Sequence, residues 1–407
     1  MAVSLKKAVT RYRLWKKGNF VPFYVELLVS SRCNLKCEMC NVWPLAEKDP
    51  SIAQRELEIT DYENLLDELS SMGTRSLCVS GGEPLLKKDV FSIIKKAKEK
   101  NFSVELITNG TLITNEIARK LLASDVDLVT VSIDSPIEEM HDQIRGAKGL
   151  WKRSTRGVRT LYDLRKRSKS QKPRLAIDYV FSKKNYRLIP EMIDLKQSLG
   201  FDEIHFLPII GRTSMSKELF LELDDLRWLK RNLKLIRQKM EMQNLPVSRL
   251  EPISSICDDM EDAAKGRYKI LNISLPKRAK REISCFAAWI QATIDPFGNV
   301  YPCCYACTFQ NSSQDLTHTC WGDEDFPMGN LKQESFMEIW NGPKYREFRN
   351  YCNKGRYEMC RCCGYDFSAS SVMTALLLNR GFLLRNFHKY AYLFMKRYID
   401  ENAGRLT

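Results

Sequence analysis

Short apolar runs alternate with longer amphipathic stretches through the first half of the chain. The runs have the length and composition of buried strands, and the stretches between them have the apolar spacing of helices. This alternation predicts an α/β fold with a parallel sheet and right-handed helical crossovers. The predicted strands are Phe23–Val29, Ser76–Ser80, Ser103–Thr108, Leu128–Ile133, Arg174–Phe181 and Glu203–Pro208. The predicted helices are Asp61–Met72, Lys88–Lys100, Asn115–Ser124 and Arg187–Leu199, and Thr60 with Glu63 predicts a capping box for the first.

The pattern changes after the sixth predicted strand. Leucine, isoleucine and methionine recur at helical spacing over 226–242, which predicts a packed helix. A turn at Pro296–Gly298 between Trp289–Ile294 and Val300–Tyr301 predicts a hairpin inside a cysteine-rich region. The predicted units are a basic amphipathic segment at 1–20, a barrel at 21–217, a helical bridge at 218–281, a cysteine-rich domain at 282–366 and an amphipathic tail at 367–407.

Three cysteines, Cys33, Cys37 and Cys40, lie in one loop directly after the first predicted strand. Three thiolates are one short of a closed zinc site or a fully ligated iron–sulfur cube. The loop can therefore hold three corners of a [4Fe–4S] cluster and leave the fourth iron open to a small molecule. The alternative is a structural zinc site that takes its fourth ligand from elsewhere in the chain.

The Cys-x3-Cys-x2-Cys loop resembles the signature of the radical S-adenosylmethionine (SAM) enzymes. In that family the open iron chelates the amino and carboxylate groups of SAM. One electron then splits the sulfonium and gives a 5′-deoxyadenosyl radical, which removes a hydrogen from the substrate. The resemblance implies a partial (β/α)6 TIM-like barrel with its chemistry at the C-terminal ends of the strands. It also implies a reductant such as flavodoxin or ferredoxin.

Further motifs follow the predicted strands and strengthen this resemblance. Glycines let the backbone approach a ligand closely, and a carboxylate can accept from an ammonium group. The family's GGEP motif, which contacts the SAM amino group, is matched here after the second strand. We interpret His141 as a structural residue. We expect Leu207–Gly211 to contact the adenine ring of SAM. The residues that the resemblance assigns to SAM are Gly81, Gly82, Glu83, Pro84, Asn109, Ser132, Asp134 and Arg145.

The cysteine-rich region looks like a SPASM/Twitch extension, a small α+β domain for an auxiliary cluster. It has a Gly-x4-Cys hairpin, a Gly-Asn-Leu segment, an Ile-Trp-Asn helix and a closing Cys-x2-Cys pair. The middle cysteine run of the longer SPASM pattern is not reproduced, so one auxiliary [4Fe–4S] cluster is expected. Its predicted ligands are Cys285, Cys303, Cys360 and Cys363. A zinc ribbon, or a second site from Cys304, Cys307, Cys320, Cys352 and Cys362, remains open.

Composition narrows the expected cellular location and partners of the protein. The chain has 407 residues, and its 14 cysteines occur in close groups that favour metal sites over disulfides. Without a signal peptide or a long apolar run, we expect a cytoplasmic protein. The net charge of +14 favours an anionic partner, and the two basic, amphipathic ends suggest peripheral contact with the inner membrane face. Packing of these ends on the barrel is the alternative. Nucleic acid is not favoured, because aromatic residues do not interleave the basic run at 148–174.

Together these features predict a radical SAM enzyme of the oxidoreductase or maturase type, with SAM and two [4Fe–4S] clusters as cofactors. The substrate is expected to be a peptide, a sugar or a lipid-linked metabolite. The alternative is a non-catalytic basic iron–sulfur or zinc protein that docks RNA or a membrane surface.

Overall fold

The computed structural model describes residues 21–40, 42–209, 218–245, 253, 287–303 and 327–353, with only the backbone at 351–353. The two chain ends, most of the predicted bridge and three predicted auxiliary ligands, Cys285, Cys360 and Cys363, lie outside these ranges. The membrane prediction rests on the two ends and stays a prediction. Within the described residues, no helix is long and apolar enough to cross a membrane.

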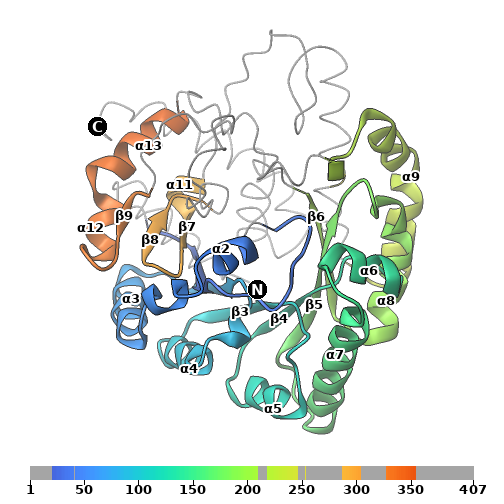
Figure 1. The fold of residues 1–407 in the computed structure, drawn as a ribbon, viewed down its shortest axis with the longest axis horizontal. Helices are drawn as coiled ribbons and strands as arrows, with labels where there is room; N and C mark the ends of the chain where they lie inside the picture. Colours follow the sequence, from blue (N-terminus) through green and yellow to red (C-terminus); the bar gives the residue numbers. More distant parts are fainter. Residues whose placement is uncertain are drawn as a thin grey trace, which may run out of the picture.

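A curved nine-stranded sheet organises the fold, in the order β6-β5-β4-β3-β2-β1-β7-β8-β9 (Figure 1). Strands β1 to β6 are all parallel, as the sequence predicts, and form the partial barrel of the expected α/β fold. These strands are β1 (Tyr24–Ser30), β2 (Ser76–Gly81), β3 (Ser103–Thr108), β4 (Leu128–Ser132), β5 (Arg174–Phe181) and β6 (Glu203–Pro208).

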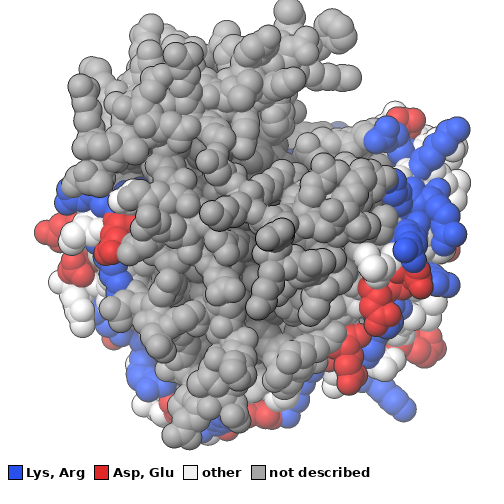
Figure 2. Space-filling view, turned by 90° about the horizontal axis from the view of Figure 1, so that it is seen from above, with Lys and Arg blue, Asp and Glu red and all other residues white. Residues whose placement is uncertain are grey.

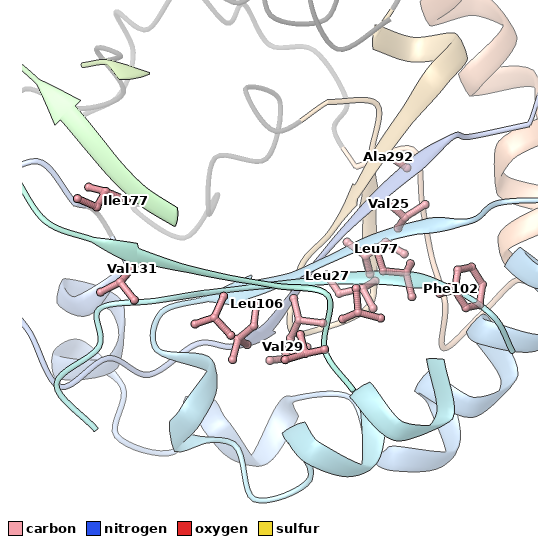
Figure 3. Close-up of a cluster of buried hydrophobic side chains, with 14 of the residues drawn as sticks. Val25, Leu27, Val29, Leu77, Phe102, Leu106, Val131, Ile177 and Ala292 are labelled. Carbon is pink, nitrogen blue, oxygen red and sulfur yellow. The ribbon is translucent and has the colours of Figure 1, made fainter. Parts of the chain in front are cut away.

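Helices cover the outer face of this sheet (Figure 1). Alternate strand residues point towards them, and the labelled side chains of Figure 3, such as Val25, Leu27 and Leu77, pack in this layer. The α-helices are α2 (Trp43–Lys48), α3 (Ile59–Met72), α4 (Val90–Glu99), α5 (Asn115–Ala123), α6 (Glu138–Arg145), α7 (Leu150–Arg167), α8 (Ile189–Leu199) and α9 (Leu223–Met242). Short 3₁₀ helices are η1 (Ile52–Arg55), η2 (Pro84–Leu86) and η3 (Tyr186–Leu188).

The start of α3 differs from the prediction. The helix begins at Ile59, and its capping box joins Glu58 to Asp61, with the Glu58 N–H donating to Asp61 Oδ2 over 2.8 Å. The predicted box of Thr60 and Glu63 is wrong, because both residues already lie inside the helix. A glutamate cap satisfies the first N–H groups as a threonine would, and it places negative charge at the positive end of the helix.

The C-terminal hairpin extends the barrel sheet. Strand β7 (Gln291–Ile294) pairs in parallel with β1, and β8 (Asn299–Tyr301) and β9 (Gly329–Asn330) continue the sheet antiparallel. The predicted strand from Trp289 begins two residues later, because Ala287–Ile290 forms the short helix α11. Helices α12 (Phe336–Asn341) and α13 (Pro343–Asn353) follow β9 and lie on the same side of the molecule as the hairpin (Figure 1).

Basic side chains gather on one flank of the molecule. Figure 2 shows Lys and Arg at the right-hand edge, the side on which α9 lies in Figure 1. The outward positions of α9 include Arg227, Arg231, Lys234 and Arg237, all exposed. Part of the net positive charge is therefore carried by a helix surface distant in sequence from the cysteine loop.

Candidate active site

The three cysteines of the loop after β1 share one small apolar cluster. Cys37 is buried with Leu35 and Leu150, and Cys33 and Cys40 pack against them. Backbone bonds tighten the loop: the Cys40 N–H and the Trp43 indole N–H both donate to the Cys37 carbonyl, over 3.1 and 3.0 Å. Burial raises the pKa of Cys33 to about 12 and that of Cys37 to about 11, and charge on the neighbouring thiols adds to both shifts.

This grouping is compatible with an iron–sulfur cluster. Among the residues that the structure describes, no three His, Cys, Asp or Glu side chains converge as ligands of one metal ion. An iron–sulfur cube binds each thiolate to a different iron, so its cysteines must share a pocket without meeting at one point. Burial and charge on the neighbouring thiols raise the pKa of Cys33 and Cys37, and positive iron would favour their thiolates.

Glu56 and Lys87 hold the first end of the loop. One carboxylate oxygen of Glu56 accepts the Ser31 N–H over 2.7 Å and the Ser31 hydroxyl over 2.9 Å. The other lies 3.2 Å from the Lys87 ammonium. Sequence reasoning missed both residues, because neither belongs to a motif.

The Gly81-Gly82-Glu83 turn also contacts this end of the loop. The Gly82 N–H donates to the Ser30 carbonyl and the Glu83 N–H to the Arg32 carbonyl, over 2.7 and 2.8 Å. A Cβ on Gly82 would lie 2.2 Å from the Arg32 oxygen, so only glycine allows this approach. The turn therefore fixes the backbone immediately before Cys33.

The side chain of Glu83 points to the end of β3. It is fully buried and accepts from the Thr108 hydroxyl, the Asn109 N–H and the Leu85 N–H, over 2.8, 2.9 and 3.1 Å. Burial raises the pKa of Glu83, and these donors oppose the shift. Three protein donors orient the carboxylate, and the expected acceptance from a SAM ammonium group stays a prediction. Pro84 then opens η2.

Asn109 joins the end of β3 to the cysteine loop. Its amide donates to the Asn34 side-chain oxygen over 2.9 Å, and Asn34 in turn donates to the Thr111 hydroxyl over 2.9 Å. Asn109 therefore contacts the loop directly, in the place where the sequence predicts a SAM contact.

Asp134 and Arg145 form a buried ion pair, with 2.6 Å between Asp134 Oδ2 and Arg145 Nε. An Arg145 Nη1 also lies 3.8 Å from the Cys37 sulfur. Burial alone would lower the pKa of Arg145, but Asp134 and Cys37 raise it above its ordinary value. The structure thus pairs the two residues with each other and with a cysteine, and the SAM contacts that the resemblance implies for both stay predictions. Ser132, which the resemblance also assigns to SAM, is half-buried at the end of β4.

The C-terminal end of α6 clamps the second end of the loop. The Glu38 N–H donates to the Ile144 carbonyl over 3.0 Å. Gly146 has a φ of +88°, and a Cβ there would lie 2.3 Å from the Lys36 carbonyl oxygen. His141 is buried in α6 and accepts the Asp134 N–H over 3.2 Å, which agrees with its structural interpretation.

Two family models match this chain. The Radical SAM superfamily model matches residues 27–171, and the SPASM model, an iron-sulfur cluster-binding domain, matches residues 285–364. The chain belongs to the radical SAM superfamily. SAM and [4Fe–4S] clusters are accordingly its cofactors, and the fold expected from the cysteine loop is confirmed.

Relatives and solved structures agree with this assignment. An AdoMet-dependent heme synthase of Methanosarcina barkeri is 35% identical over 193 residues, which are 47% of this chain and 52% of that relative. The aligned part is thus about half the length of that protein. A PqqA peptide cyclase of Granulibacter bethesdensis is 23% identical over 82% of this chain and 78% of its own. The fold is similar to that of Streptococcus suis SuiB in a crystal structure with S-adenosylmethionine bound, with a TM-score of 0.60 and 17% identity over 88% of this chain and 77% of SuiB.

In this radical SAM barrel the end of β6 packs against the cysteine loop. Ile209 is buried with Leu219 and Phe220, and Met39 and Val180 pack against them. An apolar wall therefore borders the loop on the side where the sequence predicts an adenine contact. That contact stays a prediction.

The SPASM region is described around Cys303, which lies half-buried after β8. Asp295 organises the preceding turn: its carboxylate accepts from the N–H groups of Phe297 and Asn299, both over 2.9 Å. Arg349 of α13 stacks 4.4 Å from the Trp340 ring centre and donates to the Ala288 carbonyl over 2.9 Å, which binds α13 to α11 and α12. The other predicted ligands lie outside the described residues, so the number of auxiliary clusters stays a prediction.

Proposed function

We propose that this chain cleaves SAM reductively at a [4Fe–4S] cluster held by Cys33, Cys37 and Cys40, and then removes a hydrogen atom from its substrate. One observation carries the proposal: three thiols, one buried and two half-buried, share a loop that contacts the ends of β2, β3 and β6 and the C-terminal end of α6. In parallel barrels, chemistry occurs at this end of the strands.

The chain's own residues position and tune the proposed site. When bound, the cluster and SAM supply the carbon radical that takes the substrate hydrogen. The Arg145 guanidinium, 3.8 Å from Cys37 Sγ, favours the thiolate and provides a hydrogen bond to its sulfur. Such bonds raise the reduction potential of iron–sulfur clusters. The apolar wall at Ile209 excludes water from one side of the loop. We expect a flavodoxin or a ferredoxin as the electron donor.

We infer a peptide substrate. The PqqA peptide cyclase aligns over most of this chain, and SuiB has also been crystallised with its precursor peptide SuiA. The inner face of the barrel supports this choice over a porphyrin with its carboxylates. Glu26, Glu105 and Asp178 lie on that face around Cys78, whose pKa is raised by burial and then by these three charges. Although His205 lies 2.8 Å from Asp178, the excess of carboxylates on this face disfavours anionic substrates.

The test is SAM cleavage by the reconstituted, dithionite-reduced protein under anaerobic conditions. We expect 5′-deoxyadenosine and methionine, and their loss in the Cys33→Ala/Cys37→Ala/Cys40→Ala triple variant. Cys78→Ala is the matched control, because Cys78 is buried in β2 away from the loop. Full cleavage by the triple variant would rule out the assignment.

The same triple variant reports on the auxiliary site. With one auxiliary cluster it retains about four irons per chain, and with two it retains about eight. A content of about eight irons would show that the remaining cysteines around Cys304 to Cys320 are also cluster ligands.

A further inference from the structure

Glu56 and Lys87 form an ion pair that is almost completely buried. The Glu56 carboxylate and the Lys87 ammonium are 3.2 Å apart, and their side chains are 5% and 10% exposed. Burying two charges costs free energy that their attraction returns only when further hydrogen bonds complete the site. The partners of this pair therefore indicate what it does.

On one side, the pair holds the backbone before the cysteine loop. Glu56 accepts from both the N–H and the hydroxyl of Ser31, and the Ser30 hydroxyl lies 3.4 Å from the same oxygen. Ser31 is 1% exposed, follows the last residue of β1 and precedes Cys33 by two residues. Its N–H would be buried without a partner if Glu56 were removed, which is costly.

On the other side, Lys87 is linked through Leu57 to the hairpin of the SPASM region. Lys87 also donates to the Leu57 carbonyl over 2.9 Å, and the Leu57 N–H donates to the Pro296 carbonyl over 2.7 Å. The Lys87 ammonium lies 5.6 Å from the ring centre of Tyr62. Burial raises the pKa of Tyr62, and the carboxylates of Glu56 and Asp295 add to the shift.

We propose that Glu56 and Lys87 are positioning residues that fix Ser31, and through it Cys33, relative to the β7–β8 hairpin. The consequence for catalysis rests on the proposed function, but the mechanical role does not. The pair contacts the first end of the cysteine loop, whereas α6 contacts the second end. Loss of the pair should therefore loosen Cys33 and leave Cys40 as it was.

The test uses the full-length, metal-free chain and maps cysteine alkylation by mass spectrometry. In the Glu56→Met/Lys87→Met variant two apolar side chains replace the pair, an exchange that often preserves stability, but Ser31 loses its acceptor. We expect Cys33 to alkylate about five to ten times faster relative to Cys40, the change that losing one hydrogen bond produces. The melting temperature should fall by a few degrees, because the buried Ser31 N–H loses its acceptor.

Two further variants separate positioning from charge and from stability. Glu56→Gln/Lys87→Met also removes both charges but keeps an amide oxygen for Ser31, so it should restore slow alkylation of Cys33. Glu63→Met/Lys96→Met removes an exposed ion pair with 3.1 Å between its charged atoms, joining α3 to α4, and should change nothing. An unchanged Cys33 to Cys40 ratio in the Met/Met variant overturns the proposal, as does equal acceleration at both cysteines.

A parallel SAM-cleavage assay keeps the two proposals distinct. Cleavage by the wild type together with an unchanged alkylation ratio refutes the positioning pair alone. Absence of cleavage by the reconstituted wild type, together with a changed ratio, refutes the proposed function alone. In the loaded Met/Met variant, we expect iron to pass to a chelator faster than in the wild type.

Discussion

The two ends of the cysteine loop are held in similar ways by different parts of the chain. At each end a buried ion pair stands beside a glycine whose missing Cβ lets two backbone segments touch. The first end has Glu56–Lys87 with Gly82 against the Arg32 carbonyl, and the second has Asp134–Arg145 with Gly146 against the Lys36 carbonyl. A loop that must present three thiols to one cofactor is thus fixed on both sides.

The two ends differ in how each carboxylate is supported. Glu56 has further donors in Ser31, so its charge keeps partners when the cation is removed. Asp134 is fully buried, and apart from Arg145 its carboxylate receives the Val180 N–H, over 3.2 Å. The second end should therefore depend more strongly on its cation.

The largest expected effect compares Arg145→Met with Lys87→Met. Losing Arg145 leaves the Asp134 charge buried with one weak donor and should lower the free energy of unfolding by about 3–5 kcal/mol. Losing Lys87 should cost about 1–3 kcal/mol, because Ser31 still donates to Glu56. Urea denaturation of the metal-free, full-length variants measures both values.

A charge-neutral variant sharpens this comparison. Asp134→Leu/Arg145→Met removes both charges and should recover most of the stability that Arg145→Met loses. Equal losses for Arg145→Met and Lys87→Met would show that the two pairs are equivalent, contrary to the difference in their donors.

The next effect concerns Gly146→Ala, with Gly73→Ala as its matched control. Both glycines follow a helix with positive φ, +88° and +95°, so alanine is strained by about 1–2 kcal/mol at either site. A Cβ at Gly73 meets nothing within 4 Å, whereas one at Gly146 meets the Lys36 oxygen. Gly146→Ala should cost about 1–3 kcal/mol more, the usual cost of overpacking. It should also bind less iron on reconstitution, and similar iron contents for the two variants would show that the loop tolerates the displacement.

The smallest effect is the pH dependence of the second end. Burial, and then the charge of Arg145, lower the pKa of His141 to about 3, below its unfolded value of about 6.5. Below pH 6.5 the unfolded chain gains a proton that the folded chain does not, so stability falls as pH falls from 6.5 towards 3. Between about pH 7 and 5.5 His141 should account for about 1 kcal/mol.

Comparing the pH dependence of the unfolding free energy in the wild type and in His141→Asn isolates this contribution. The asparagine Oδ1 can accept the Asp134 N–H in place of the imidazole Nδ1, but the asparagine side chain does not titrate. Identical pH profiles for the variant and the wild type in urea denaturation would show that His141 is not the group responsible.

The sequence by itself determined the parallel strands, the family and the residues that surround the cysteine loop. The parallel sheet followed from alternating patterns that each local segment carries, and β3, β5 and β6 match their predicted bounds. The motif residues Gly82, Asn109 and Arg145 do contact the loop or pack against it. Spacing along the chain suffices for Gly82 and Asn109 because both directly follow a strand, whereas Arg145 ends helix α6.

Only the tertiary structure decided the partners of the charged side chains. Glu83 and Arg145 belong to motifs, yet the sequence did not predict that Glu83 would accept from Thr108 and Asn109 or that Arg145 would pair with Asp134. Glu56 and Lys87 lie 31 residues apart and belong to no motif, so their pairing depends on how the segments before α3 and after η2 pack. The parallel pairing of β7 with β1 likewise joins segments more than 250 residues apart. Such contacts arise from burial in three dimensions, for which a single sequence has no local pattern.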